Sequence, residues 1–199
     1  MELADAIARR RMVRAFTDQP VDPAMVTALL DQARRAPSAG HSQGTAFVVL
    51  DTPAAVGGYW AITLPAERRA GFRWPGLLAA PVLVVALCSP AAYAERYAEP
   101  DKARTGLGRA ADAWPTPYWF VDGGMAVQNL LLGLVDAGLA GCFFGLFEHE
   151  PAVLASLGVP DGWRALGTVA LGHPAPSDAG RSAARPRRAL DEVVHRTRW

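Results

Sequence analysis

The longest apolar tract of the sequence covers residues 118–141 and reads YWFVDGGMAVQNLLLGLVDAGLAG. Its length would suit a membrane span, but polar side chains interrupt it, and these are costly in lipid. They are Asp122, Gln128, Asn129 and Asp136. We therefore predict a long helix that is buried in protein, from about residue 117 to residue 137. Gly138 stands where a glycine commonly ends a helix.

The chain is long enough to cover such a helix with a core of its own. It has 199 residues, of which 51% are hydrophobic and 20% charged, as in globular proteins. We expect one domain over residues 1–199, with a variable lid or pocket region at about 60–116. The net charge of +1 provides no overall attraction to nucleic acid or to an anionic membrane, and we expect neither as a partner.

The N-terminus, MELADAIARRRMVRAF, lacks the apolar core of a signal peptide. The two cysteines, Cys88 and Cys142, form neither a CxxC motif nor a disulfide framework. These features favour the reducing cytoplasm as the location of the protein.

Hydrophobic periodicity predicts the remaining elements. Further helices are expected at residues 2–10, from Asp22 to before Pro37, and at 151–158, with short helices and loops at 53–80 and 89–116. Strands are expected at residues 45–51, 81–88, 140–147 and 164–172, the second being apolar throughout and therefore central. Helices and strands alternate only loosely and no GxGxxG follows a strand, so an α+β fold is favoured over a doubly wound sheet.

Several common catalytic motifs are missing from the sequence. There is no GxxxxGK[ST], HExxH or GxSxG, which leaves a phosphate-binding loop, a zinc protease and a nucleophile elbow without support. The four histidines are far apart and lack the spacing of metal ligands, so we expect no metal site. They are His41, His149, His173 and His195.

Arginine is concentrated at the two ends of the chain. Lys102 is the single lysine among 20 basic residues, and the arginines cluster at residues 9–14 and 181–198. A GC-rich genome would explain the abundance of arginine, and any single one is more often a solvated surface charge than a ligand contact. Two guanidinium groups that converge in space could nevertheless bind a phosphate or carboxylate.

Six segments in a fixed order carry a resemblance to a known family. They are RRMVRAF at 10–16, APSAGHSQGTAFVVL at 36–50, DGGMAVQNLLLGLVDAGLAGCFFG at 122–145, LGVP at 157–160, ALGTVALGHPA at 165–175 and RPRRALDEVVH at 185–195. Together they resemble the nitroreductase family of FMN-dependent oxidoreductases over nearly the whole chain. The resemblance implies an α+β sandwich, with a central mixed sheet flanked by helices, that forms an intertwined homodimer with FMN at the dimer interface.

The same resemblance implies which residues bind the cofactor. Arg10 and Arg187, with Arg185, would hold the FMN phosphate, and Arg14 would lie at the pyrimidine edge of the flavin. There its positive charge would favour the anionic reduced flavin. The full set implied is Arg10, Arg11, Met12, Arg14, Pro37, Ser38, His41, Phe144, Gly145, Arg185 and Arg187.

Backbone groups supply the rest of the implied site. Pro37 and Ser38 would face the flavin of the other subunit, and residues 143–146 would place N–H groups near its reactive nitrogen, where Gly145 allows close approach. Hydride would pass from NADH or NADPH through FMN to a small organic electrophile, such as a nitroaromatic, quinone or enone, without a side-chain nucleophile.

Four residues depart from the family pattern and leave alternatives open: Met12, His41, and Gly44 with Thr45, which replace a usual Pro-Trp. Met12 stands where the family usually has Ser, and His41 where it has Asn. His41 could donate a hydrogen bond or a proton near the flavin, or simply be tied to backbone or water. These departures admit a biosynthetic flavoenzyme reoxidised by oxygen, or a flavin-binding protein without turnover.

Aromatic residues could wall a substrate pocket or pack in the interior. They are Trp60, Trp74, Trp114, Tyr118 and Trp119. We expect packing for Trp119, which lies on the predicted helix, and the pocket for Trp114, which lies beside prolines.

Overall fold

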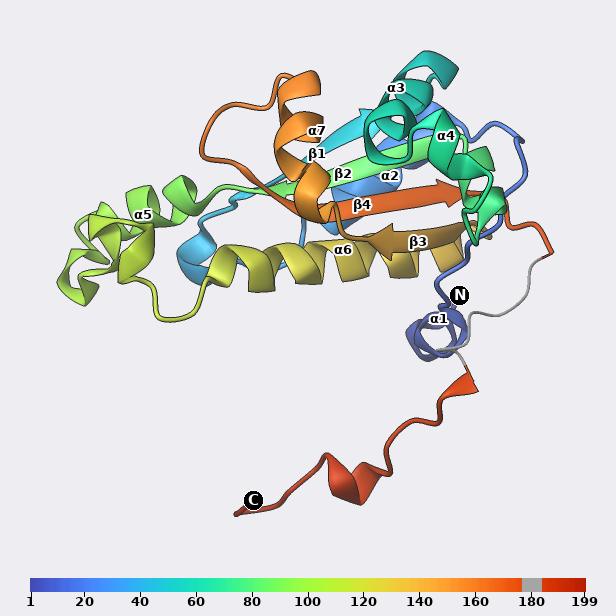
Figure 1. The fold of residues 1–199 in the computed structure, drawn as a ribbon. Helices are drawn as coiled ribbons and strands as arrows, with labels where there is room; N and C mark the ends of the chain where they lie inside the picture. The colour runs from blue at the N-terminus through green and yellow to red at the C-terminus, as the bar shows by residue number, and fades with distance from the viewer. Residues whose placement is uncertain (177–183) are drawn as a thin grey trace.

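A four-stranded sheet lies at the centre of the computed structural model, which describes residues 1–176 and 184–199 (Figure 1). The strands are β1 (Thr45–Leu50), β2 (Val82–Cys88), β3 (Ala140–Phe144) and β4 (Arg164–Gly172). Their order is β1-β2-β4-β3 and each pair is antiparallel. Among the described residues, the parallel pairing of the expected mixed sheet is reduced to one bridge, between Met12 and Gly141.

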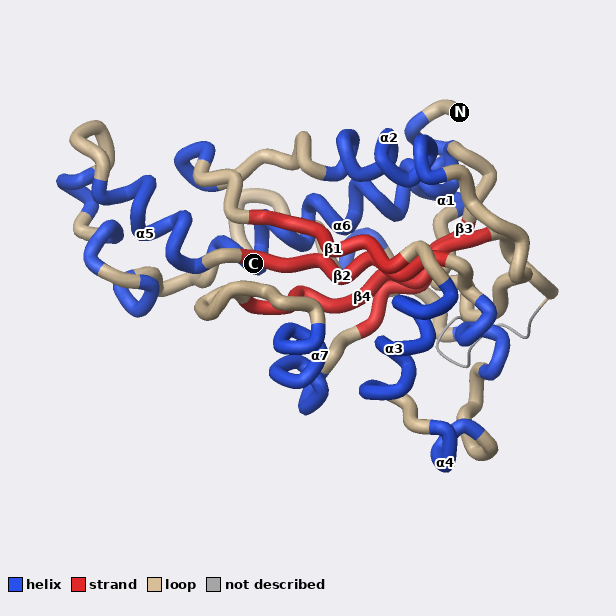
Figure 2. The backbone as a smooth tube through the Cα atoms, turned by 90° about the horizontal axis from the view of Figure 1, so that it is seen from above, coloured by secondary structure: helices blue, strands red, loops and turns tan. Residues whose placement is uncertain are grey.

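Helices cover both faces of this sheet (Figure 1, Figure 2). Helices α2 (Pro23–Ala33) and α6 (Tyr118–Asp136) pack on one face, and α3 (Pro53–Thr63) and α7 (Glu150–Ser156) on the other. Side chains of β2 alternate between the two sides, as the pleat requires. Val82 and Val84 join the core beneath α2 and α6, while Leu83 and Val85 join the core beneath α3. All of β2 is therefore buried, as its apolar sequence predicted.

Helix α6 confirms the long buried helix expected from the apolar tract. It has 19 residues and ends before Gly138, whose φ of +72° is the left-handed conformation that glycine adopts most readily. Its inner face includes Leu130 and Leu134, both fully buried. Of the four polar residues that interrupt the tract, only Asp122 is buried.

The other helices are short, and three of them begin at a capping residue, of which Asp22 was expected from the sequence. Asp22 accepts a hydrogen bond from the N–H of Ala24 at the start of α2, and Thr52 and Ser89 cap α3 and α5 in the same way. The remaining α-helices are α1 (Leu3–Arg9), α4 (Ala66–Arg69) and α5 (Pro90–Ala98). Short 3-10 helices are η1 (Ala39–His41), η2 (Pro75–Ala79), η3 (Ala103–Thr105), η4 (Leu107–Arg109), η5 (Ala111–Ala113), η6 (Phe147–His149) and η8 (Leu190–Glu192).

An aromatic cluster joins α5 to the beginning of α6. Trp114 is only 7% exposed, packs edge-on against Tyr93 and Tyr97, and donates a hydrogen bond from Nε1 to the Leu107 carbonyl. The expectation that Trp114 lines a pocket is therefore wrong, because other aromatic rings surround its indole and its N–H already has an acceptor. Trp119 is buried in the same cluster, which confirms the packing role expected for it.

The C-terminal segment extends away from the body of the protomer (Figure 1). Every residue from Ala184 to Trp199 is exposed, including Leu190 and Val193. Among the residues that the structure describes, no helix has both the length and the apolar character needed to cross a bilayer.

Candidate functional site

The segment that carries the N-terminal arginines lies beside strand β3. Met12 forms a parallel bridge with Gly141, and the N–H of Val13 donates to the Gly141 carbonyl at 3.1 Å. The sulfur of Met12 accepts a hydrogen bond from the N–H of Phe143 at 3.4 Å. The Met12 side chain therefore packs against the sheet, which fixes the position of the arginines on either side of it.

Arg10 has a buried guanidinium nitrogen without a partner. In residues 1–176 and 184–199, Nη1 of Arg10 and Nε1 of Trp60 are the buried side-chain polar atoms that lack any hydrogen bond. A buried donor without an acceptor is costly, and a guanidinium is best satisfied by a phosphate or carboxylate. The residue expected to bind the FMN phosphate thus retains the donor that such a contact needs.

The neighbouring arginines differ in what they contact. Arg14 donates from Nη1 to the Met12 carbonyl at 3.1 Å, and its guanidinium carbon lies 5.2 Å from the centre of the Trp74 ring. Arg11 is exposed and donates to the carbonyls of Ala8 and Arg10 at the end of α1. The geometry therefore assigns Arg11 to helix capping, whereas Arg14 is held by the Met12 carbonyl and the Trp74 ring.

Strand β3 ends in the segment expected to approach the flavin. A side chain at Gly145 would place its Cβ 3.0 Å from the ring of Phe147. Phe147 is 82% exposed and has a φ of +48°, which is unusual for an aromatic residue. Phe144 stacks on Trp60 with ring centres 5.9 Å apart. An aromatic wall therefore lies beside the backbone of this segment.

The loop over residues 36–43 has an uncommon backbone. Gly40, His41 and Gln43 all have φ between +51° and +61°, and Ser38 Oγ accepts a hydrogen bond from the N–H of Gln43. Only glycine adopts this conformation without cost, so the rest of the structure must hold the loop in place. His41 is exposed, and its ring forms no hydrogen bond with any residue that the structure describes.

Helices α5 and α6 supply that support. Asp122, on α6, is 4% exposed, and its Oδ2 accepts hydrogen bonds from the Ala39 N–H at 2.8 Å and from the Tyr93 hydroxyl at 2.7 Å. Arg96 donates from Nε to the Gly40 carbonyl at 2.8 Å. Burial, followed by the Asp122 carboxylate, raises the pKa of Tyr93, so its hydroxyl remains a donor at neutral pH.

The sequence reasoning did not identify these supporting residues. The signal for Asp122 was present, because a carboxylate in an apolar helix is costly unless it is hydrogen-bonded. Tyr93 and Arg96 had no such signal, since they lie in a region without a recognisable motif.

The two groups of predicted cofactor residues lie at opposite ends of α6. The loop with Pro37, Ser38 and His41 is fixed at Asp122, whereas Gly141, which pairs with Met12, packs against Leu134. At about 1.5 Å per residue, Asp122 and Leu134 are about 18 Å apart along the helix axis. One chain therefore does not bring the two groups together. Figure 1 shows the loop and the N-terminal segment at different ends of α6.

The C-terminal arginines are likewise apart from the body of this chain. Arg185 and Arg187 lie in the exposed segment that begins at Ala184. The structure therefore does not bring them into contact with Arg10 within one protomer.

The remaining reactive side chains are poorly suited to catalysis. Cys88 and Cys142 are buried, and burial raises the pKa of both thiols, that of Cys88 to about 12. Both therefore remain protonated and unreactive at neutral pH. Among residues 1–176 and 184–199, no group of three or more His, Cys, Asp or Glu side chains could hold a metal ion.

Comparison with known proteins gives a consistent picture. Residues 7–173 match the model of the nitroreductase family. A 5,6-dimethylbenzimidazole synthase from Rhodospirillum rubrum is 30% identical over 178 residues, which cover 83% of this chain and 78% of that protein. A protein of Archaeoglobus fulgidus assigned as an NADH dehydrogenase or NAD(P)H nitroreductase is 22% identical and covers 100% of this chain and 99% of its own length.

A solved structure has a similar fold. A protein of Exiguobacterium sibiricum assigned as a nitroreductase, and solved in complex with FMN, aligns with a TM-score of 0.77 at 16% identity. The alignment covers 98% of this chain and 97% of that one.

Asp122→Ala should destabilise the protein and loosen the loop, because it removes the acceptor of the Ala39 N–H and the Tyr93 hydroxyl. We expect the free energy of unfolding to fall by about 1.5–3 kcal/mol. Urea denaturation measures this loss, and amide hydrogen exchange should accelerate over residues 38–43. Asp136→Ala is the matched control, since Asp136 is an exposed residue of the same helix that pairs with the N-terminal amine. Equal effects of the two substitutions would contradict the supporting role of Asp122.

Proposed function

Because the chain belongs to the nitroreductase family, as the resemblance predicted, we propose that it is an FMN-dependent oxidoreductase that acts as a homodimer. Its reductant would be NADH or NADPH, and its second substrate a small organic electrophile such as a nitroaromatic, quinone or enone. The observation that carries the proposal is the buried, unpartnered guanidinium nitrogen of Arg10. This nitrogen is a strong hydrogen-bond donor that can bind an anion, and it lies in the segment where the family pattern requires one.

Several residues of this chain fit a bound FMN. Arg10 would bind the phosphate, and Arg14, held by the Met12 carbonyl and the Trp74 ring, would place a positive charge at the pyrimidine edge. That charge would favour reduction, since it stabilises an anion that forms only then. Gly145 would let the N–H groups beside it come close to the flavin, with the exposed ring of Phe147 alongside.

When bound, FMN supplies the redox chemistry, accepting a hydride from NADH or NADPH and passing it to the electrophile. The protein's task is then binding, orientation and exclusion of water. The buried state of both cysteines supports a mechanism without a side-chain nucleophile.

A homodimer would complete the site that one chain leaves divided. Helix α6 is apolar on its buried face and also on an exposed stripe formed by Tyr118, Val121 and Met125, which are 42%, 46% and 36% exposed. A helix that is apolar all round is normally covered on all sides. If two α6 helices pack antiparallel about a two-fold axis near the middle of the helix, the stripe of one lies along the C-terminal half of the other, and the loop of one approaches the N-terminal segment of the other.

The exposed C-terminal segment supports the same assembly. Leu190, Val193 and Val194 are 75%, 50% and 49% exposed, so this apolar segment has no cover in its own protomer. We propose that it packs on the partner subunit, and that Arg187 and Arg185 reach an FMN phosphate in the dimer. We propose a cytoplasmic location, as the free cysteines favour.

A second candidate is favoured by one relative. The 30% identical protein from Rhodospirillum rubrum is named as a synthase, and a biosynthetic flavoenzyme reoxidised by oxygen would suit the altered residues Met12 and His41. His41, exposed on a loop attributed to the dimer interface, would be available to donate a proton in either case.

Anaerobic reduction should distinguish the two candidates. We expect the purified protein to bind FMN and show flavin absorbance near about 450 nm. Under the first proposal, NADH or NADPH bleaches this band without oxygen, and a quinone or nitroaromatic restores it. A flavin that no nicotinamide reduces would favour the second candidate, while a colourless protein that binds no added FMN would contradict both.

Arg10→Ala should weaken FMN binding, because it removes a charge-assisted contact to the phosphate. A loss of about 1.5–3 kcal/mol corresponds to a rise in Kd of about 10- to 150-fold, and we expect a similar rise for Arg187→Ala. Fluorescence titration with FMN measures both. Arg9→Ala is the matched control, since Arg9 is an exposed neighbour at the end of α1. An unchanged Kd in Arg10→Ala would refute the phosphate role.

Val121→Glu/Met125→Glu should yield a monomer with little affinity for FMN, because two buried charges would oppose packing along the α6 stripe. Sedimentation equilibrium measures the mass, and flavin absorbance the occupancy. Met25→Glu, at a methionine that is 41% exposed on α2, is the control and should stay dimeric. A double variant that remains a flavin-loaded dimer would show that the stripe is not the interface.

A further inference from the structure

Phe147 combines an exposed side chain with a strained backbone, just after the segment that follows β3. Its side chain is 82% exposed, and its φ of +48° lies in the left-handed region, which is costly for an aromatic residue. Residues strained in this way persist only where the surrounding structure holds them, and they are concentrated at active sites and ligand-binding sites. The combination of strain and exposure therefore favours a functional role for this ring.

The residues on both sides of Phe147 hold this conformation. Leu146 is 4% exposed and packs in the core beneath α3. Glu150, at the start of α7, accepts hydrogen bonds from Nε of Arg164 at 2.8 Å and from the N–H of Ala165 at 2.9 Å. Phe147 lies in the turn between these two anchors, so its backbone is held although its side chain is exposed.

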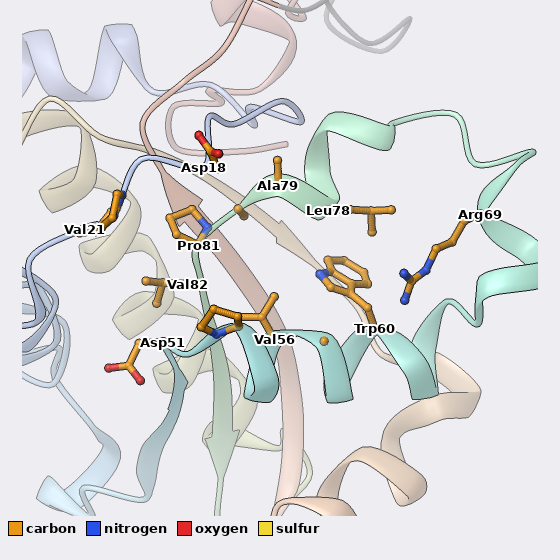
Figure 3. Close-up of a pocket in the computed structure, with 14 residues that line it drawn as sticks. Asp18, Val21, Asp51, Val56, Trp60, Arg69, Leu78, Ala79, Pro81 and Val82 are labelled. Carbon is orange, nitrogen blue, oxygen red and sulfur yellow. The ribbon is translucent and has the colours of Figure 1, made fainter.

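Phe144, three residues earlier, shows the contrast. It is half-buried and stacks on Trp60 with ring centres 5.9 Å apart, and Trp60 lines a cavity of about 470 Å³ beside α3 (Figure 3). Phe147 neither lines this cavity nor belongs to a core cluster of the described residues. The apolar area of Phe147 is therefore left uncovered within the described part of the protomer.

The ring of Phe147 lies against the backbone at Gly145. A Cβ built on Gly145 would lie 3.0 Å from Cζ and 3.2 Å from Cε2 of this ring, so a side chain there would displace it. Residues 143–146 are the ones whose N–H groups would approach the reactive part of a bound FMN. The exposed ring therefore borders the place where a substrate would lie to receive the hydride.

We propose that Phe147 is a specificity-determining residue whose ring stacks on a planar aromatic substrate, so that the preferred electrophile is a nitroaromatic rather than an aliphatic enone. This inference rests on the proposed function. Stacked aromatic rings gain free energy beyond the burial of apolar area, and an aliphatic molecule does not obtain this gain. Because the backbone of Phe147 is already held, little freedom is lost when the ring binds a ligand.

The test measures the Kd of nitrobenzene for the FMN-loaded protein without NADH or NADPH, so that the ligand binds and is not reduced. The change in flavin absorbance reports binding, and 2-cyclohexenone is the aliphatic comparison. Phe147→Ala should raise the Kd of nitrobenzene by about 2- to 12-fold, as expected for a lost aromatic stack, and leave that of 2-cyclohexenone nearly unchanged. Phe147→Tyr should restore the affinity. Met25→Ala, at an exposed apolar residue of α2, is the control and should change neither value.

Phe147→Gly separates a binding role from a structural one. Glycine adopts the left-handed conformation readily, so the relief of strain should raise the urea midpoint of unfolding. The affinity for nitrobenzene should fall as it does in Phe147→Ala. A ring that is packed in the dimer interface would instead make this variant less stable.

The proposal is overturned if Phe147→Ala binds nitrobenzene as tightly as the wild type, if both ligands lose affinity equally, or if Phe147→Gly lowers the urea midpoint. Each of these outcomes leaves the proposed function intact, because FMN is still bound. A wild-type protein that takes up no FMN would contradict the proposed function, and this inference with it.

Discussion

The packing of α6 against the sheet determines the rest of the structure. Its buried face, with Leu130 and Leu134, forms one half of the core together with β2 and α2. Its N-terminal turns hold the loop of residues 36–43 through Asp122, and its C-terminal half adjoins the strand that positions Met12 and the arginines. Both groups of proposed cofactor residues are thus positioned by the same helix, α6, and the length of that helix sets the distance between them.

Strain and its compensation are concentrated in that loop. Three residues with positive φ, two of them not glycine, are unfavourable on their own and persist only where neighbours hold them. Asp122 and Arg96 provide hydrogen bonds to the loop backbone, and Tyr93 completes the pairing of the buried carboxylate. A rigid, outward-facing loop of this kind is suited to contact a ligand or a partner, since little flexibility remains to be lost on binding.

The candidate site could be predicted only in part from sequence, and particular residues show why. Arg10 and Gly145 belong to local motifs, so their positions could be inferred from the pattern around them. The prediction that Trp114 lines a pocket was wrong because it relied on the neighbouring prolines. Tyr93 and Tyr97, which pack against the ring, come from a separate segment of the chain. The separation of the loop from the N-terminal segment likewise depends on how α6 is oriented, which no local pattern records.

The sequence by itself determined the long buried helix, the central strand β2, the start of α2 at Asp22, and the family to which the chain belongs. These follow from short-range periodicity and turn chemistry, which act between residues close in the chain. Only the tertiary structure decided that Asp122 supports the loop, that Nη1 of Arg10 lacks a partner, and that Arg14 lies against the Trp74 ring. Each of these depends on which distant side chains meet, and burial decides whether a polar atom has found a partner.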